Sequence, residues 1–292
     1  MRTLISVTFA VLLVARTVAQ SPPPPQAGGR GGGQPVQPIS PPLRPGLFMV
    51  TGAGANSIVR VTSDGVILVD GKLPGEENYN ALMAQIKSVT DKPVKYMIVT
   101  HHHADHTGNN DRFLAAGVKI IAQENLNKNL ETYQFNPRPA KADITYDREY
   151  VVSLGGARAE VHHYGRSHTS GDSIVYFPDL KVVAMSDALT TTGQGPLIDY
   201  AGGGSALEWL HVLDEVLKLD ITGVIPGNGP ILGPAYLRTY RMQLGTVVDR
   251  LTELVRKGVP KDQILMQLKT DDIGWTPRIP SLDGLYAELS AH

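Results

Sequence analysis

The string His-His-His-Ala-Asp-His follows directly on an apolar segment at residues 94–100. Its four imidazoles and one carboxylate are the nitrogen and oxygen ligands that metals of the zinc type prefer. If residues 94–100 form a buried strand, His101 and His103 leave its end in a tight loop and turn toward one ion. Asp105 and His106 are adjacent and point elsewhere. The pattern therefore indicates ligands for two neighbouring metals.

A histidine run also occurs in expression tags and in solvated polar loops. A tag lies at a terminus and is not interrupted by Ala-Asp in the middle of a chain, whereas a strand followed by a loop is the context that a metal motif requires. A metal site is therefore favoured. His102 occupies the variable position between two ligands, and we expect it not to bind metal.

The pattern His101-x-His103-x-Asp105-His106 resembles the signature of the metallo-β-lactamase superfamily. Three later segments resemble further landmarks in the order of that family: residues 165–172 with His168, residues 185–187 with Asp187, and residues 226–230 with Asn228. The resemblance extends over residues 43–292. Four motifs in the correct order identify a family more specifically than any one of them.

The resemblance implies an α/β fold, a four-layer αββα sandwich in which two mixed sheets are flanked by helices and hold the metals at one edge. It implies three ligands of a first metal: His101, His103 and His168. The implied ligands of a second metal are Asp105 and His106, with Asp187 bridging the two ions. Asp105 would also act in catalysis, by holding the attacking hydroxide through a hydrogen bond.

Asn228 departs from the family pattern, which usually has histidine between the two glycines. An amide oxygen is neutral and binds zinc-type ions less well than imidazole. The second metal is then less fully occupied, or water replaces the histidine with little effect, since an open position is normal at catalytic metals. We expect one tightly bound zinc ion and a weaker second one, with Asn228 as a weak or substituted ligand; iron is the alternative metal.

The N-terminal residues 1–19 have the features of a signal peptide: an early Arg2, an apolar run at residues 4–14, and small residues before position 20. The apolar run is too short for a bilayer, which requires about 20 residues. We therefore expect export to the periplasm or beyond, with no stable membrane anchor after cleavage. Residues 20–42 are rich in proline and glycine and are predicted to be a disordered linker to the catalytic domain at residues 43–292.

The formal net charge of −1, without a run of basic residues, gives no electrostatic footprint for nucleic acid or an anionic membrane. The sequence contains no cysteine, so disulfides and thiolate ligands are excluded and any metal is held by nitrogen and oxygen. A small-molecule substrate is the expected partner. Composition leaves the oligomeric state open.

Hydrophobic periodicity predicts strands and helices in two similar halves. Strands are expected at residues 56–61, 66–70, 94–100, 118–122, 149–154, 158–164, 173–177 and 181–185. Helices are expected at residues 76–88, 108–116, 205–219, 234–257 and 260–268. This order predicts two sheets packed face to face with helices outside. Asp70 and Asp172 are candidates to orient the metal loops from behind.

The expected activity is that of an exported zinc-dependent hydrolase. Zinc with three imidazole ligands keeps one position for water and lowers its pKa to about 7, so that hydroxide can attack an amide, ester or lactone carbonyl. β-Lactams are one substrate class among several, because a fold alone does not specify the substrate. Two alternatives remain: a mononuclear iron oxygenase acting on a sulfur substrate, and a metal-binding protein whose weakened second site has lost catalysis.

Overall fold

The computed structural model describes residues 33–191, 193, 195–276 and 279–291. The expected signal peptide at residues 1–19 lies outside the described residues. Among the helices that the structure describes, none combines the length and the apolar character needed to cross a membrane.

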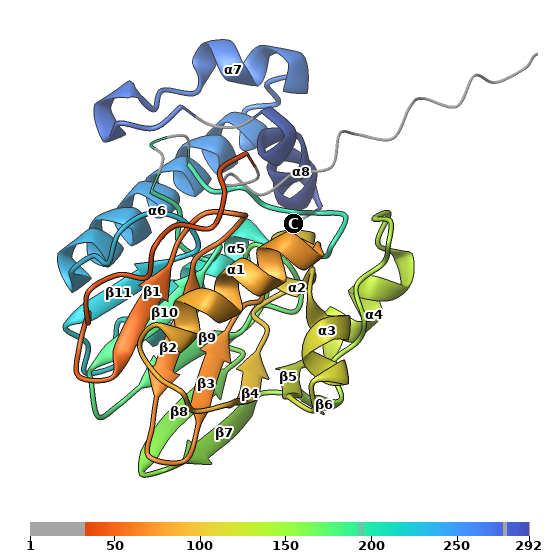
Figure 1. Cartoon of the computed structure of the whole chain (residues 1–292). Helices are drawn as coiled ribbons and strands as arrows, with labels where there is room; N and C mark the ends of the chain where they lie inside the picture. Colours follow the sequence, from red (N-terminus) through yellow and green to blue (C-terminus); the bar gives the residue numbers. More distant parts are fainter. Residues whose placement is uncertain (1–32, 192, 194, 277–278, 292) are drawn as a thin grey trace, which may run out of the picture.

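Two mixed sheets form the centre of the molecule (Figure 1). The first has six strands in sequence order: β1 (Leu47–Val50), β2 (Ser57–Val61), β3 (Val66–Val69), β4 (Val94–Ile98), β5 (Lys119–Gln123) and β6 (Ile144–Tyr146). Strands β3 to β6 are parallel, whereas β1 and β2 are antiparallel to their neighbours. The second sheet has the order β11-β10-β9-β8-β7: β7 (Glu149–Leu154), β8 (Ala157–His162), β9 (Ile174–Phe177), β10 (Val182–Ser186) and β11 (Gly223–Pro226). Among the strands that the structure describes in this sheet, only β10 and β11 pair in parallel, and the others pair antiparallel.

The helices lie outside the two sheets (Figure 1). Those that follow strands of the first sheet are α1 (Glu76–Lys87), α2 (Ala104–Thr107), α3 (Asn110–Ala115) and α4 (Glu124–Thr132). Those beside the second sheet or beyond it are α5 (Ala206–Val216), α6 (Pro234–Arg256), η1 (Lys261–Gln263), α7 (Ile264–Gln267), η2 (Asp271–Ile273) and α8 (Ile279–Ser290).

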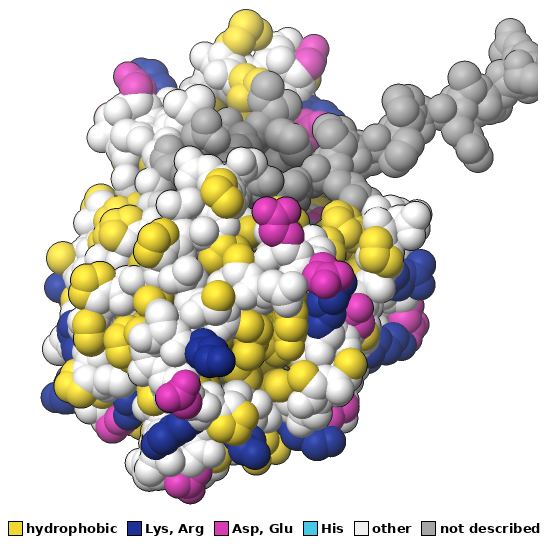
Figure 2. Space-filling view, in the orientation of Figure 1, with side chains coloured by type: hydrophobic (Ala, Val, Ile, Leu, Met, Phe, Trp, Pro, Cys, Tyr) yellow, Lys and Arg dark blue, Asp and Glu magenta, His cyan; other side chains and the backbone are white. Residues whose placement is uncertain are grey.

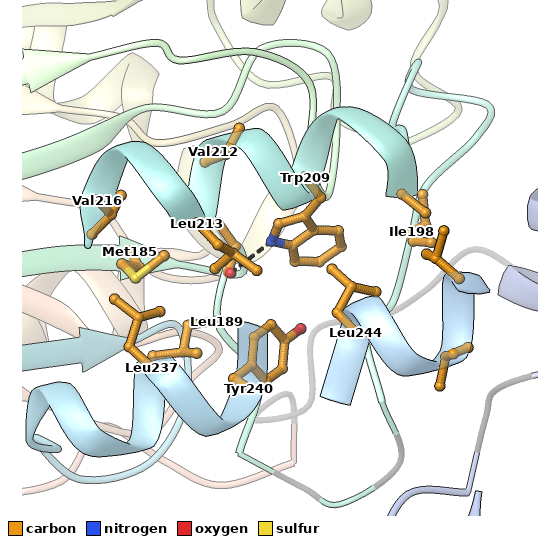
Figure 3. Close-up of a cluster of buried hydrophobic side chains, with 14 of the residues drawn as sticks. Met185, Leu189, Ile198, Trp209, Val212, Leu213, Val216, Leu237, Tyr240 and Leu244 are labelled. Carbon is orange, nitrogen blue, oxygen red and sulfur yellow. Dashed lines mark hydrogen bonds between the residues drawn. The ribbon is translucent and has the colours of Figure 1, made fainter. Parts of the chain in front are cut away.

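Three separate groups of buried apolar side chains define four layers. One group lies between the two sheets and includes Ile67 and Phe177. A second joins the first sheet to its helices through Leu82 and Phe113. The third joins the second sheet to α5, α6 and α8, and Trp209 lies at its centre (Figure 3). The expected αββα sandwich of two mixed sheets is confirmed. Its central strands β3, β9 and β10 are buried along their whole length and consist mainly of apolar residues, because both of their faces are covered.

Three of the expected segments differ in the structure. The expected helix at residues 108–116 is shorter in the structure, where it is α3, and a separate short helix, α2, precedes it at residues 104–107. Between the two helices Gly108 passes close to Pro74, and a Cβ at position 108 would lie 2.2 Å from the Pro74 nitrogen. The expected helix at residues 260–268 is a 3-10 turn followed by the single turn α7. Helices α4 and α8 were not anticipated.

The third difference concerns the end of the expected linker. Its residues 34–40 run antiparallel to β1: the Gln37 N–H donates to Thr51 O (2.9 Å), and the Ser40 N–H donates to Met49 O (2.8 Å). The Ala53 N–H in turn donates to Gln34 O (2.7 Å). This segment is ordered because it satisfies backbone groups at the edge of the sheet, which composition alone does not reveal.

Candidate metal centre

The expected metal ligands meet at one end of the sandwich, where four chain segments leave their strands. β4 leads into the loop of His101 and His103, and β10 leads directly to Asp187. His168 lies between β8 and β9, and Asn228 follows β11. Strand ends on a rigid scaffold commonly present loops for chemistry. Segments far apart in sequence are therefore brought together here by the topology of both sheets.

Three imidazoles form the first group. His103 Nδ1 lies 3.1 Å from His101 Nε2 and 3.0 Å from His168 Nε2, and all three side chains are buried. Burial, reinforced by the neighbouring histidines, holds the pKa of His101 well below its usual value, so this ring is neutral and has a lone pair for a metal. Three converging imidazole nitrogens suit a zinc-type ion.

A second group lies beside the first. His106 Nε2 is 3.5 Å from Asp105 Oδ2 and 3.8 Å from Asp187 Oδ1. The other oxygen of Asp187 is 3.8 Å from His168 Nε2, so this carboxylate extends between the two groups. Asp105 Oδ2 and His106 Nε2 are buried and have no hydrogen-bond partner among the described residues. Buried polar atoms normally have partners, and a cation between them would fit this donor set.

Asp70 holds the metal loop from behind. It accepts hydrogen bonds from the Thr100 N–H (2.9 Å), from the Thr100 hydroxyl and from His106 Nδ1 (2.8 Å). Burial acts to lower the pKa of His106, but the carboxylates of Asp105 and Asp70 outweigh it and hold that pKa well above its usual value. In the absence of metal His106 is therefore protonated, so a metal that binds Nε2 displaces a proton.

Asp172 holds the loop that carries His168 in place through hydrogen bonds to its neighbours Ser167 and Thr169. It accepts from the Thr169 N–H at 2.9 Å and from the Thr169 hydroxyl at 2.6 Å, and the Ser167 hydroxyl also donates to it. The residues on both sides of His168 are thereby fixed, which sets the direction of the imidazole between them.

Sequence reasoning missed Asp199 and Tyr133. Asp199 Oδ2 lies 2.9 Å from His103 Nε2, which leaves Nδ1 of that ring facing the metal group. The Tyr133 hydroxyl accepts from the Ala104 N–H (3.2 Å), and its ring packs edge-on against His102. Both residues lie in segments without a motif, and only the tertiary fold brings them to the site.

His102 is buried, although the motif alone places it at a variable position. Its Nε2 lies 3.6 Å from Asp199, and its Nδ1 lies 3.4 Å from the amide of Asn129. Burial, together with His103, lowers its pKa to about 3, so the ring is neutral. His102 thus lies beside the first group, and with His103 and Asp199 it forms a third set of side chains whose possible ligand atoms all lie within 4.8 Å of one another.

The loop that carries Asn228 is held against Asp187. A Cβ at Gly227 would lie 1.9 Å from Asp187 Oδ1, so glycine is required for this close approach. The Asn56 amide donates to Pro226 O and to Gly229 O, both at 2.9 Å, and fixes the loop on either side. The Thr191 hydroxyl donates to the backbone oxygen of Asn228 (2.9 Å). Position 228 is thus adjacent to the carboxylate that extends between the two groups.

Lys72 is fully buried near the second group. Its ammonium donates to Val50 O and Ala55 O, both at 2.6 Å, at the two ends of the loop formed by residues 51–55. Burial lowers the pKa of Lys72 to about 7 against the opposing effect of Asp70 and Asp105. The loop passes close to Asp105, because a Cβ at Gly54 would lie 2.5 Å from its Cβ.

These features define an αββα protein with a metal-binding group of histidines and carboxylates at the edge between its sheets. Residues 50–228 match the metallo-beta-lactamase superfamily. The chain belongs to the metallo-β-lactamase superfamily. Members of this superfamily are mostly metal-dependent hydrolases of small molecules.

Two curated relatives illustrate the range of the family. The chain is 27% identical over 206 residues to "Metallo-beta-lactamase IND-1" of Chryseobacterium indologenes, which covers 65% of this chain and 81% of that protein. It is 28% identical over 189 residues to "2,4-dinitroanisole O-demethylase subunit alpha" of Nocardioides sp. (strain JS1661), covering 64% of this chain. The match spans only 56% of the length of that subunit.

Solved structures share the fold. A metallo-beta-lactamase from Pontibacter korlensis aligns with a TM-score of 0.61 at 22% identity, covering 73% of this chain and 99% of that one. The sec-alkylsulfatase Pisa1 from Pseudomonas sp. aligns with a TM-score of 0.69 at 16% identity, covering 86% of this chain and 50% of that one. At such identities these likenesses establish the fold alone.

Proposed function

We propose that the protein is an exported zinc-dependent hydrolase that cleaves an amide, ester or lactone carbonyl of a small molecule. One observation carries this proposal: three nitrogens of His101, His103 and His168 converge beside Asp105 Oδ2 and His106 Nε2, two buried atoms that have no hydrogen-bond partner among the residues the structure describes. Asp187 lies within 3.8 Å of both groups. The donor set fits two ions of the zinc type, and we assign the first to the three histidines and the second to Asp105, His106 and Asp187.

Zinc bound here would supply a Lewis acid and lower the pKa of a water molecule to about 7. Asp105, besides holding the second ion, would orient the nucleophile, because its carboxylate lies within the site and its Oδ2 has no hydrogen-bond partner in the described part of the chain. The pKa of Asp105 is held below its usual value by His106 and His103 in spite of burial, so this oxygen stays an acceptor at neutral pH. The side chains of His101, His106 and Asp105 are buried, and charge interactions are stronger in such surroundings than in water.

The substrate approaches from the side of Asp187 and Asp199. Their side chains are 19% and 20% exposed, whereas that of His103 is 8% exposed and those of Asp105 and His106 are 3% and 0% exposed. The entrance therefore has two carboxylates. Lysine and arginine side chains are interspersed with acidic ones on the face drawn in Figure 2, and no continuous basic patch is visible there.

The proposal is tested by measuring metal content together with hydrolysis of β-lactam, lactone, thioester and phosphodiester substrates. We expect zinc in the purified protein, and turnover of at least one carbonyl substrate that is lost with a chelator and restored by zinc. A single iron with oxygen consumption on a sulfur substrate would indicate an oxygenase instead. Full zinc occupancy with no turnover in the whole panel would identify a metal-binding protein without catalysis.

Asn228→His is expected to strengthen the second zinc site about tenfold or more, because an added imidazole completes a four-ligand set. If the second metal stabilises the leaving group, amide hydrolysis should increase more than hydrolysis of an activated ester. Calorimetric zinc titration of both proteins measures the two affinities. Two equally tight sites in the unmodified chain would show that Asn228 does not limit the second metal.

Export is proposed from the sequence of residues 1–19, which has the features of a signal peptide. The expected result is an exported chain that begins near Gln20. Mass spectrometry of the protein recovered outside the cytoplasm tests this, and recovery of intact protein only from the cytoplasm would contradict it.

A further inference from the structure

One loop, residues 195–204, supplies hydrogen-bond partners to two of the three histidines in the first metal group. Leu197 O accepts from His168 Nδ1 (2.5 Å), and Asp199 Oδ2 accepts from His103 Nε2 (2.9 Å). Each bond places a proton on the nitrogen that faces away from the group and leaves the other nitrogen free for metal. Such outer partners orient metal-binding histidines and affect metal affinity. We call residues 195–204 the orienting loop.

The orienting loop also follows the backbone of the histidine it orients. The Asp199 N–H donates to His168 O (2.8 Å), and the Ser205 N–H donates to Ser167 O (3.0 Å). A Cβ at Gly204 would lie 2.5 Å from His168 O. The loop therefore cannot shift without displacing His168.

Helix α8 holds the orienting loop from its outer side. The Ser281 hydroxyl accepts from the Ile198 N–H (3.0 Å), between the two residues that contact the metal-binding histidines. Glu288 accepts from the Tyr200 hydroxyl (2.9 Å) and from the Ala206 N–H (3.1 Å).

Glu288 thereby joins the end of the loop to the first turn of α5. The Ser205 hydroxyl is a third donor to it (2.5 Å), and a carboxylate is favourable at a helix N-terminus. Figure 1 shows α8 at the same end of the sandwich as α2, where the metal loop begins.

The contact between α8 and the loop is closely packed. Ile198, Leu282 and Leu285 are buried in one apolar group. Gly284 lies against the ring of Tyr200, and a Cβ there would lie 1.9 Å from a ring carbon. Helix α8 lies beyond residues 50–228, the part of the chain that matches the family.

We propose that α8 positions the ligands of the first metal, with Ser281 and Glu288 as positioning residues that act through the orienting loop. The inference rests on the proposed metal site but not on the reaction catalysed there. Loss of an outer partner of a metal-binding histidine typically lowers metal affinity about 10- to 100-fold. Because Glu288 acts one contact further out, we expect a decrease of about 5- to 10-fold.

The test compares Glu288→Gln and Ser281→Ala with Asp283→Asn in the full chain. Asp283 is on the same helix but pairs with Lys261 at the surface (3.3 Å), so its substitution removes one carboxylate without touching the loop. Zinc affinity is measured by competition with a chromophoric chelator, and the absorption spectrum of the cobalt-substituted protein reports the geometry of the ligands. Thermal unfolding of the metal-free protein is measured in parallel.

Weaker binding of the tighter zinc and an altered cobalt spectrum in Glu288→Gln and Ser281→Ala, but not in Asp283→Asn, would support the proposal. Lower thermal stability with unchanged zinc affinity and cobalt spectrum would overturn it and leave α8 with a structural role only. If either variant fails to fold, Tyr200→Phe removes a single hydroxyl bond to Glu288 and is judged by the same two readouts. Zinc binding without hydrolysis in the unmodified chain would refute the proposed function and leave this test intact.

Discussion

Replacing His103 by alanine is expected to remove the first metal and to lower turnover by roughly three orders of magnitude. Loss of a group that stabilises charge in an active site commonly lowers the rate by about this factor. His103 Nδ1 is the atom that both other nitrogens of the group face, at 3.1 and 3.0 Å. Its loss leaves two imidazoles, too few for a zinc site. It also removes the hydrogen-bond partner of Asp199 at 2.9 Å.

The measurement is zinc content after dialysis, together with the hydrolysis rate at saturating substrate. His211→Ala is the matched control, because His211 is an exposed histidine on α5 whose side chain is 61% accessible. The zinc content and the hydrolysis rate of His102→Ala should lie between those of His103→Ala and His211→Ala. His102 is not one of the three expected ligands of the first metal, but it is buried beside Asp199. Retained zinc and retained activity in His103→Ala would overturn the assignment of the first site.

Lys72→Met is expected to change how stability depends on pH. The unfolded chain keeps this amine protonated up to its usual pKa of 10.5, whereas in the folded protein the pKa is about 7. Between these values folding releases a proton, so this residue makes the folded state more stable as pH rises from 7 to about 10. Below pH 7 the protein carries the full cost of a buried charge. We expect the free energy of unfolding of the unmodified protein, relative to that of Lys72→Met, to rise by up to about 1.4 kcal/mol per pH unit between pH 7 and 10.

Urea unfolding of the metal-free proteins at pH 7, 8, 9 and 10 measures this difference. The stability of the unmodified protein relative to Lys72→Met should rise steadily over that range, because other titrating groups are common to both and cancel. Lys92→Met is the control: the Lys92 amine also donates to two carbonyl oxygens, Thr62 O (2.8 Å) and Ser63 O (2.6 Å), but the residue is exposed. Parallel curves for the unmodified protein and Lys72→Met would show that the buried amine stays charged.

The sequence predicted those parts of the site in which several residues act within one short segment. His101, His103, Asp105 and His106 share a single loop, and the apolar segment before them predicts its strand. The sequence Ser205-Ala206-Leu207-Glu208 has the capping-box pattern at the start of the helix expected at residues 205–219, and the Ser205 hydroxyl accepts from the Glu208 N–H (3.1 Å) at the start of α5. Local chemistry and local periodicity are sufficient in these cases.

The outer partners of the histidines were not predictable in this way. Asp199 is separated from His103 by 96 positions, and the loop that carries it has no periodic pattern. Glu288 reaches Ser205 across 83 positions. Such contacts depend on how the second sheet and its helices pack, and neither residue type nor spacing encodes them. The pairing of residues 34–40 of the expected linker with β1 was not predictable for the same reason.

That pairing also determines where the chain enters the domain. Gln34 O accepts from the Ala53 N–H, and Ala53 belongs to the loop whose Gly54 lies against Asp105. Anything joined to the chain upstream of Gln34 is therefore attached at the end of the sandwich that carries the metal ligands. A molecule held at a surface through its N-terminus would therefore have its point of attachment at the same end of the sandwich as its metal centre, and not at the opposite end.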